Sequence, residues 1–139
     1  CYSPNYFTLE NIANSEDGQI SFEITEIVSN GEKLIISLKG DEEVPSSFSY
    51  CLEEGELFIS ESLNGTTEKR PIMINDDVYT YKIFDEFIIY RCQKKIIYLL
   101  NEEIVSVTNL VNNDFKMIGD VRINSSSSAE LFGNIKFKF

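Results

Sequence analysis

Short runs of alternating apolar and polar residues, separated by turn-forming residues about every 8–12 positions, constrain the fold of this chain more than any other feature. Two such runs in residues 19–39 flank Asn30-Gly31, a dipeptide that strongly favours a tight hairpin turn. Because successive residues of a strand point to opposite faces, each run presents one apolar and one polar face. We therefore predict a β-hairpin over residues 19–39 and a second one around Glu54-Gly55.

The following part of the chain continues this pattern. The stretch "YTYKIFDEFIIYRCQKKIIYLL", residues 79–100, is rich in aromatic and β-branched residues, which favour strands. Residues 71–100 are predicted to carry three strands, with turn-forming residues at 75–77, 85–86 and 94–95. Residues 101–114 carry strand-forming side chains, but at helical spacing, and we predict a short helix there. The end of the chain predicts two strands around a serine-rich loop.

These elements predict an all-β protein. A chain of 139 residues has the size of one domain, so we expect a single β domain over residues 1–139. Many short strands with frequent turns are typical of antiparallel barrels and sandwiches. We expect an antiparallel up-and-down β-barrel with one short helix, and the alternative is a two-sheet β-sandwich.

The charge of the chain excludes several classes of partner. Acidic residues outnumber basic ones by 23 to 12, which gives a net charge of −11 and a pI near 4.4. This acidity promotes solubility and repels both a phosphate backbone and an anionic membrane surface. No apolar run approaches the ~18 residues of a membrane helix. We expect no nucleic-acid partner and no membrane span.

Several residue types and motifs that carry catalytic chemistry are missing from the sequence. The chain has no histidine, which removes the commonest general base and the usual zinc and copper ligand. It also has no glycine-rich phosphate loop and no Cys-x-x-Cys motif. The acidic pairs Asp76-Asp77 and Asp85-Glu86 are possible glycosidase couples, but they lie among turn-forming residues, where solvated carboxylates are common. We expect no enzymatic activity, no catalytic residue, no metal site and no cofactor.

Three cysteines allow one disulfide and one free thiol. We predict that Cys51 pairs with Cys92, because both lie in strand-like runs; Cys1 with Cys92 is the competing pair. The sequons at Asn64 and Asn124 lie in polar, turn-like stretches that suit N-glycosylation. Together with a cysteine at the first position, they favour a secreted, extracellular glycoprotein. A lipidated Cys1, as in bacterial lipoproteins, is a further option, although "CYSPNYF" is aromatic rather than a polar tether.

Three stretches taken together resemble a lipocalin of the apolipoprotein D and arthropod type. They are Cys1 followed by Asn5-Tyr6, the glycine-containing region from Asp17 to Gly40, and "YTYKIFDEFIIYRC" up to Cys92. The family's opening glycine-x-tryptophan motif is absent, and the chain has no tryptophan. The resemblance implies an eight-stranded barrel whose lumen holds one small ligand.

The resemblance makes the apolar strand faces candidate ligand contacts in the lumen. These residues are Phe22, Ile24, Ile36, Leu38, Tyr79, Tyr81 and Ile89. The same residues would otherwise form an ordinary packed core. We therefore expect a secreted, non-enzymatic protein that binds a small hydrophobic molecule. The alternatives are a β-sandwich module that binds a protein partner through exposed edges or loops such as 41–50, 61–77 and 124–134, and a storage or structural protein without a specific ligand.

Overall fold

The structure is a computed structural model that describes residues 6–9, 17–28, 31–40, 46–92, 94–110, 117–123 and 133–138. Within these ranges the regular secondary structure consists of β-strands, with no helix. The strands are β1 Tyr6–Leu9, β2 Asp17–Ile24, β3 Leu34–Gly40, β4 Ser47–Leu52, β5 Leu57–Leu63, β6 Thr66–Pro71, β7 Met73–Ile74, β8 Asp77–Val78, β9 Glu86–Cys92, β10 Lys95–Leu100, β11 Glu103–Asn109, β12 Met117–Ile123 and β13 Gly133–Lys138.

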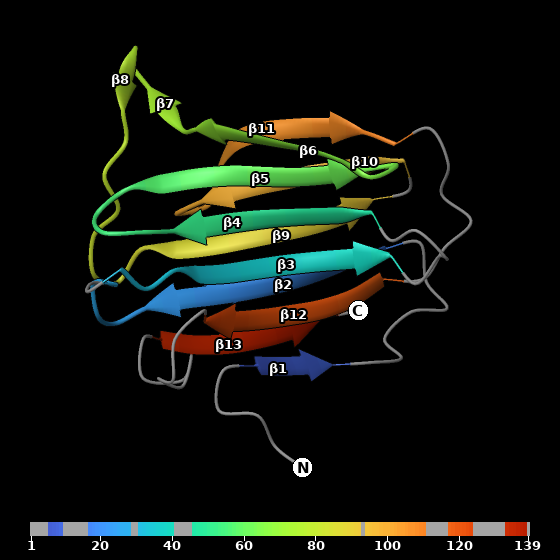
Figure 1. Ribbon diagram of the computed structural model, residues 1–139, viewed down its shortest axis with the longest axis horizontal. Coiled ribbons are helices and arrows are strands. Elements are labelled where there is room, and N and C mark those ends of the chain that lie inside the picture. Colours follow the sequence, from blue (N-terminus) through green and yellow to red (C-terminus); the bar gives the residue numbers. More distant parts are fainter. Residues whose placement is uncertain are drawn as a thin grey trace.

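The strands form two large antiparallel sheets and one small ribbon. The six-stranded sheet has the order β1-β12-β3-β4-β5-β6, and the five-stranded sheet has the order β11-β10-β9-β2-β13. Figure 1 shows the two sheets stacked one behind the other, with the β7–β8 ribbon projecting at one corner. The arrangement is a two-sheet β-sandwich.

The core lies between the two sheets and is filled by their inward-facing apolar side chains. The Tyr50 ring of β4 packs 5.2 Å from the Phe87 ring of β9 and 5.4 Å from the Tyr98 ring of β10, measured between centroids. The Tyr50 hydroxyl also donates a hydrogen bond of 2.7 Å to the Leu99 carbonyl of the opposite sheet. Aromatic pairs at these separations add to the stabilisation that comes from apolar burial.

The prediction of a closed barrel is wrong, as the pairing of the outermost strands shows. Among the described strands, β6 and β1 each pair on one side only, as do β11 and β13. Both sheets therefore have open edges and do not close on one another, whereas a barrel requires every strand to pair on both sides. The sandwich, which was the alternative expectation, is the fold that the structure supports.

The predicted hairpin over residues 19–39 is wrong as a pairing, although both of its strands are present. β2 pairs with β9 and β13, whereas β3 pairs with β12 and β4 in the other sheet. Gly31 does adopt a turn conformation, with φ of 74°. The turn therefore lies in a connection that crosses between the sheets, because both β2 and β3 bury their apolar faces in the shared core.

The predicted hairpin around Glu54-Gly55 is confirmed, since β4 and β5 pair across it. The predicted helix is wrong for residues 103–109, which form the edge strand β11. Their β-branched side chains fit a half-buried strand, and tertiary pairing with β10 outweighs the helical spacing. The rest of that prediction, beyond Leu110, lies outside the described residues.

The segment between β8 and β9 does not form the strand that its alternation predicts. The amide of Phe84 donates to the Ile24 carbonyl at 2.7 Å, and the amide of Ile24 donates to the Asp85 carbonyl at 3.1 Å. These bonds join the turn at residues 82–85 to the end of β2. Tyr81 is only 2% exposed and lies in the core, whereas Ile83 and Phe84 are exposed.

Candidate functional site

The outer face of the six-stranded sheet carries hydroxyl groups where its inner face carries apolar side chains. In β4, Phe48 and Tyr50 point into the core, so the intervening Ser47 and Ser49 point outward. The same alternation in β5 sets its outward serines against the inward Ile59. Strand geometry thus places one polar row on each of two adjacent strands.

The strand register brings these hydroxyls together in one groove of about 480 Å³. Its described lining residues come from β3 to β6 and from the residue before β3, and they are Lys33, Ile35, Lys39, Ser47, Ser49, Cys51, Ser60, Ser62, Thr67 and Lys69. Ser47 lies opposite Ser62, and Ser49 lies opposite Ser60. The volume falls in the range of ~300–1,000 Å³ that is typical of small-molecule sites.

Hydrogen bonds hold some of these hydroxyls in place. The Ser49 hydroxyl oxygen lies 2.7 Å from that of Ser37 and 3.3 Å from that of Ser47. The Thr67 hydroxyl donates to the Ser62 hydroxyl over 3.4 Å. A hydroxyl donates one hydrogen bond and accepts up to two. The floor of the groove therefore offers both donors and acceptors.

Glu53 organises the positive charge at one end of the groove. Its carboxylate pairs with the Lys69 ammonium and, at 3.6 Å, with the Lys33 ammonium. The hydrogen bond from Lys69 lowers the pKa of Glu53, and the same bond raises the pKa of Lys69. The Lys69 ammonium also lies 4.3 Å from the centroid of the Phe58 ring. Glu53 therefore holds both ammonium groups at this end of the groove.

Cys51 contributes a thiol to the groove. It is 6% exposed, and the thiol donates a weak hydrogen bond of 3.7 Å to the Glu53 carboxylate. Burial raises the pKa of this thiol, so the neutral form is favoured. A reactive thiolate needs the opposite shift. Cys51 therefore contributes a small, uncharged side chain to the lining of the groove.

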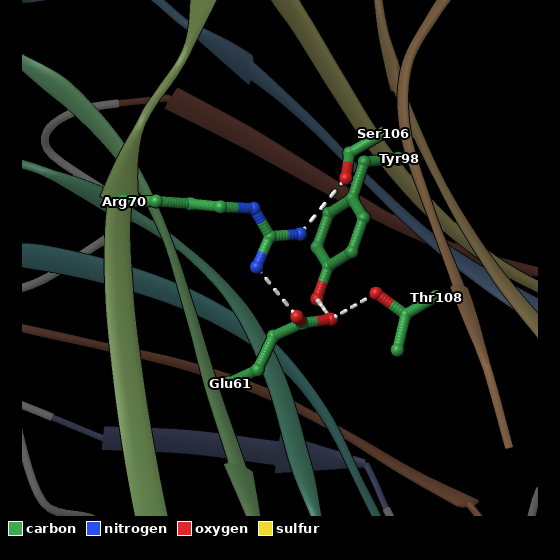
Figure 2. Close-up of polar contacts among 5 residues, drawn as sticks. All are labelled: Glu61, Arg70, Tyr98, Ser106 and Thr108. Carbon is green, nitrogen blue, oxygen red and sulfur yellow. Dashed lines mark hydrogen bonds and ion pairs between the residues drawn. The ribbon is translucent and has the colours of Figure 1, made fainter.

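Behind the groove, Glu61 forms a polar cluster between the sheets, drawn in Figure 2. This carboxylate of β5 accepts hydrogen bonds from Arg70 at 2.7 Å, from Tyr98 at 2.9 Å and from Thr108 at 2.5 Å. Arg70 also donates to the Ser106 hydroxyl at 2.8 Å. Burial and the nearby Glu61 charge raise the pKa of Tyr98. The cluster ties β5 and β6, which form one wall of the groove, to β10 and β11.

A second tie lies near the Glu53 end of the groove. The buried Tyr81 hydroxyl donates to the Glu53 carbonyl at 2.8 Å and accepts from the Val28 amide at 2.9 Å. The glutamate that pairs with both lysines is therefore anchored through its backbone to the core.

The residues predicted to line a barrel lumen lie instead in or against the core of the sandwich. Six of them, Phe22, Ile24, Ile36, Leu38, Tyr81 and Ile89, belong to the buried cluster. Tyr79 packs against that cluster, and its hydroxyl donates to Asp85 at 2.6 Å. The structure therefore brings the seven residues together, but between two sheets. Whether any of them contacts a ligand stays a prediction.

The predicted disulfide between Cys51 and Cys92 is not formed, and both are free thiols. Cys51 faces outward from the six-stranded sheet, whereas Cys92 is at the end of β9 and faces outward from the other sheet, so the two lie on opposite faces of the sandwich. Cys1 lies outside the described residues, as does Asn124. Asn64 is exposed in the β5–β6 turn, so its glycosylation stays a prediction.

The described residues contain no cluster of three or more Cys, Asp or Glu side chains arranged to hold a metal ion. In the same ranges, no helix is long and apolar enough to cross a membrane. Neither acidic pair is among the described lining residues of the groove. Asp85 caps the turn before β9, where it accepts from the Lys82 amide at 2.8 Å and from the Asn101 side chain at 2.9 Å. These hydrogen bonds hold the turn at residues 82–85 in place.

The outer face of the five-stranded sheet is apolar along β9, β10 and β11. The register places six outward apolar side chains side by side: Ile88, Tyr90, Ile97, Leu99, Ile104 and Val107. Ile104 is 63% exposed and Val107 is 47% exposed. Apolar side chains gathered on an exposed face are typical of interaction surfaces.

The sequence-based reasoning missed the groove. Its signal was present in "SFSYCL" and "FISES", where serine alternates with apolar residues on adjacent strands. We attributed function to the apolar face of the strands, because that face is the more conspicuous one. The polar face became informative only when the register placed β4 beside β5.

No family model and no curated protein matches this chain. Solved structures do share its fold. Sheep galectin-11, solved in complex with glycerol, has a TM-score of 0.57 at 10% identity over 99% of each chain. A variant of human galectin-16 has a TM-score of 0.54 at 14% identity over 95% of each chain.

A glycoside hydrolase family protein from Mycobacterium thermorestibile has a TM-score of 0.57 at 9% identity. The match covers 88% of this chain but 62% of the hydrolase, so the chain spans less than two thirds of that protein. At these identities the likeness concerns the fold alone. The lipocalin resemblance is therefore wrong, because the chain has the β-sandwich fold of galectins rather than a closed barrel.

Proposed function

We propose that this protein is a non-enzymatic binding module that holds a saccharide in the groove on the outer face of β3 to β6. The observation that carries this proposal is the row of five lining hydroxyls on three adjacent strands, Ser47, Ser49, Ser60, Ser62 and Thr67. Sugar hydroxyls donate and accept hydrogen bonds, and serine and threonine hydroxyls complement them in both respects. A groove lined by hydroxyls suits such a ligand better than an apolar molecule.

The comparisons support this choice of ligand class. One structural neighbour is named a glycoside hydrolase family protein, and another was solved with the polyol glycerol. The absence of enzymatic activity is part of our proposal. The described lining contains no carboxylate, whereas glycoside hydrolysis commonly uses two. Secretion also belongs to the proposal, and the exposed sequon at Asn64 is compatible with it.

Binding to a saccharide array, followed by amide chemical-shift mapping of the best binder, tests the proposal. Shifts should concentrate on the outward residues of β4, β5 and β6. Ser60→Leu and Ser62→Leu replace half-buried groove hydroxyls and should each weaken binding by about fivefold or more, since each removes one hydrogen bond worth ~1 kcal/mol. Ser21→Leu makes the same change on the outer face of the other sheet and should leave binding unchanged. Shifts confined to the core or to the five-stranded sheet would overturn the proposal.

A protein partner is a second candidate function, favoured by the apolar outer face of β9 to β11. The alternative expectation from the sequence was a sandwich that binds a protein through exposed edges or loops, and β11 is an edge strand. Ile104→Lys and Val107→Lys should abolish such binding and leave the saccharide groove intact, because the two faces lie on opposite sheets. Hydrogen-exchange mapping of a purified complex should show protection of β11. Protection confined to the six-stranded sheet would exclude this candidate.

A further inference from the structure

We infer that the saccharide bound by this groove is anionic, an oligosaccharide that carries sulfate ester or carboxylate groups. The inference rests on the proposed saccharide-binding function and specifies its ligand class. The observation behind it is the placement of Lys33, Lys39 and Lys69 around the hydroxyl rows, with no acidic residue among the described lining residues.

The charge of the groove departs from that of the whole chain. Acidic residues outnumber basic ones by 23 to 12 in the sequence, yet every charged residue of the described lining is a lysine. Glu53 pairs with Lys33 and Lys69 from outside the lining, and Glu32, Glu54 and Glu56 border the neighbouring hollow that Lys33 also lines. A ligand seated in the groove contacts the lysines directly, whereas acids that lie beyond the Debye length of about 8 Å at physiological ionic strength are screened.

The register places the lysines at opposite ends of the groove. Lys39 lies on β3 beside Ser47 of β4, whereas Lys69 lies on β6, three strands away from β3. With strands about 4.8 Å apart and a rise of about 3.3 Å per residue, their Cα atoms are separated by roughly 15 Å. Lys33 lies six residues before Lys39, or roughly 20 Å along the strand direction. An oligosaccharide that lies along the groove can contact both positive ends at once.

The lining also offers little to a neutral sugar beyond hydrogen bonds. The described part of the lining contains no aromatic side chain, and the Lys69 ammonium lies 4.3 Å from the centroid of the nearby Phe58 ring. Hydrogen bonds between neutral groups exchange with water at small net gain. Charge-assisted hydrogen bonds to sulfate or carboxylate are about twice as strong. An ammonium has three donors, so the pairing of Lys69 with Glu53 does not use all of them.

The charge of Glu53 provides a second, independent test of the affinity for anionic ligands. Glu53 holds two lysines at one end of the groove, but its own charge opposes an incoming anion. Glu53→Gln removes that charge and keeps the size of the side chain. This variant should bind an anionic oligosaccharide about two- to fivefold more tightly, which is the effect of one screened charge at a partly exposed site. It should bind a neutral oligosaccharide as the unmodified protein does.

Calorimetric titration with matched ligands tests the inference: a sulfated oligosaccharide against its desulfated form, and an oligouronate against its carboxyl-reduced form. The charged member of at least one pair should bind at least tenfold more tightly, and the pair that shows this identifies the anionic group. Lys39→Gln and Lys69→Gln should each weaken that binding by about three- to tenfold, since each lysine is partly exposed. Lys94→Gln, in the β9–β10 turn of the other sheet, is the matched control and should have no effect.

Each remaining outcome has one meaning. Equal binding of the charged and neutral members, mapped to the groove, overturns the anionic inference and leaves the saccharide proposal standing. Charged ligands that bind equally to the lysine variants and to the unmodified protein also overturn the inference, because the contact is then elsewhere. No binding by either member of either pair overturns the inference. If the saccharide array is also negative, the proposed function fails with it.

Discussion

Removal of the Glu61 carboxylate should destabilise the sandwich, because it leaves hydrogen-bond donors from both sheets without their acceptor. Glu61 is 7% exposed and accepts from Arg70, Tyr98 and Thr108. In Glu61→Ala, the fully buried Tyr98 hydroxyl loses its acceptor at about 1–3 kcal/mol. Thr108 is half-buried and adds about 1 kcal/mol. The Arg70 side chain is 39% exposed and can be rehydrated, so its lost ion pair adds under about 1 kcal/mol.

The sum is a loss of about 3 kcal/mol in the free energy of unfolding. Urea denaturation should show this as a fall in midpoint of about 1.5 M, for a slope near 2 kcal/mol/M, with the slope itself unchanged. Tyr98→Phe should lose only about 1 kcal/mol, since the carboxylate keeps its other two donors.

Glu68→Ala is the matched control for this series. Glu68 lies directly opposite Glu61 on β6 but is exposed, so its removal should change stability by less than about 0.5 kcal/mol. A Glu61→Ala variant as stable as Glu68→Ala would refute the reasoning. It would mean that the carboxylate is hydrated and that the contacts between the sheets in Figure 2 contribute nothing.

Three further predictions concern the groove and the turns. The hydrogen bond from Lys69 lowers the pKa of Glu53 in the folded state. The stability that Glu53 adds should therefore be present above the ordinary carboxyl pKa of about 4.5 and be lost as the pH falls through the lowered pKa. The difference in unfolding free energy between the unmodified protein and Glu53→Gln, measured as a function of pH, should shrink in that window. Cys51 should be alkylated slowly in the native protein at pH 8 and rapidly after unfolding, as peptide mass spectrometry would show, and rapid native labelling would contradict its burial. Gly65→Ala should lower the free energy of unfolding by about 1 kcal/mol, because Gly65 has a φ of 81° that alanine adopts only with strain. Phe84→Gly should leave stability unchanged or raise it, because Phe84 has a φ of 73° and is 71% exposed. In thermal unfolding, a loss above about 1 kcal/mol in Phe84→Gly would show that the Phe84 ring packs against the protein.

The positions of the strands were largely predictable from the sequence. The alternation of apolar and polar residues depends only on the two-residue period of a strand, so it located β2, β3, β5, β9 and β10. In β2, β3 and β9 it also identified side chains that are buried in the core, such as Phe22, Ile36 and Ile89. Turn chemistry is equally local, and Glu54-Gly55 correctly marked the β4–β5 hairpin. The all-β class followed from these local signals.

The sheet to which each strand belongs was decided by the tertiary structure. β2 and β3 are consecutive in sequence and were expected to pair, yet each pairs with strands far along the chain. The local pattern around Gly31 is the same for a hairpin turn and for a crossover between sheets. The crossover is favoured over the hairpin because it lets β2 and β3 bury their apolar faces in one shared core. The free energy of that burial depends on all the strands that form the core.

The candidate site also depends on which strands pair with one another and in which register. A serine between two core residues is, in the sequence, only a residue on the polar face of a strand. It becomes part of a groove because β3 to β6 lie side by side and place Ser47, Ser49, Ser60, Ser62 and Thr67 in adjacent rows. Local propensity determined which side chains face outward, and the register of neighbouring strands alone determined that they face one ligand together.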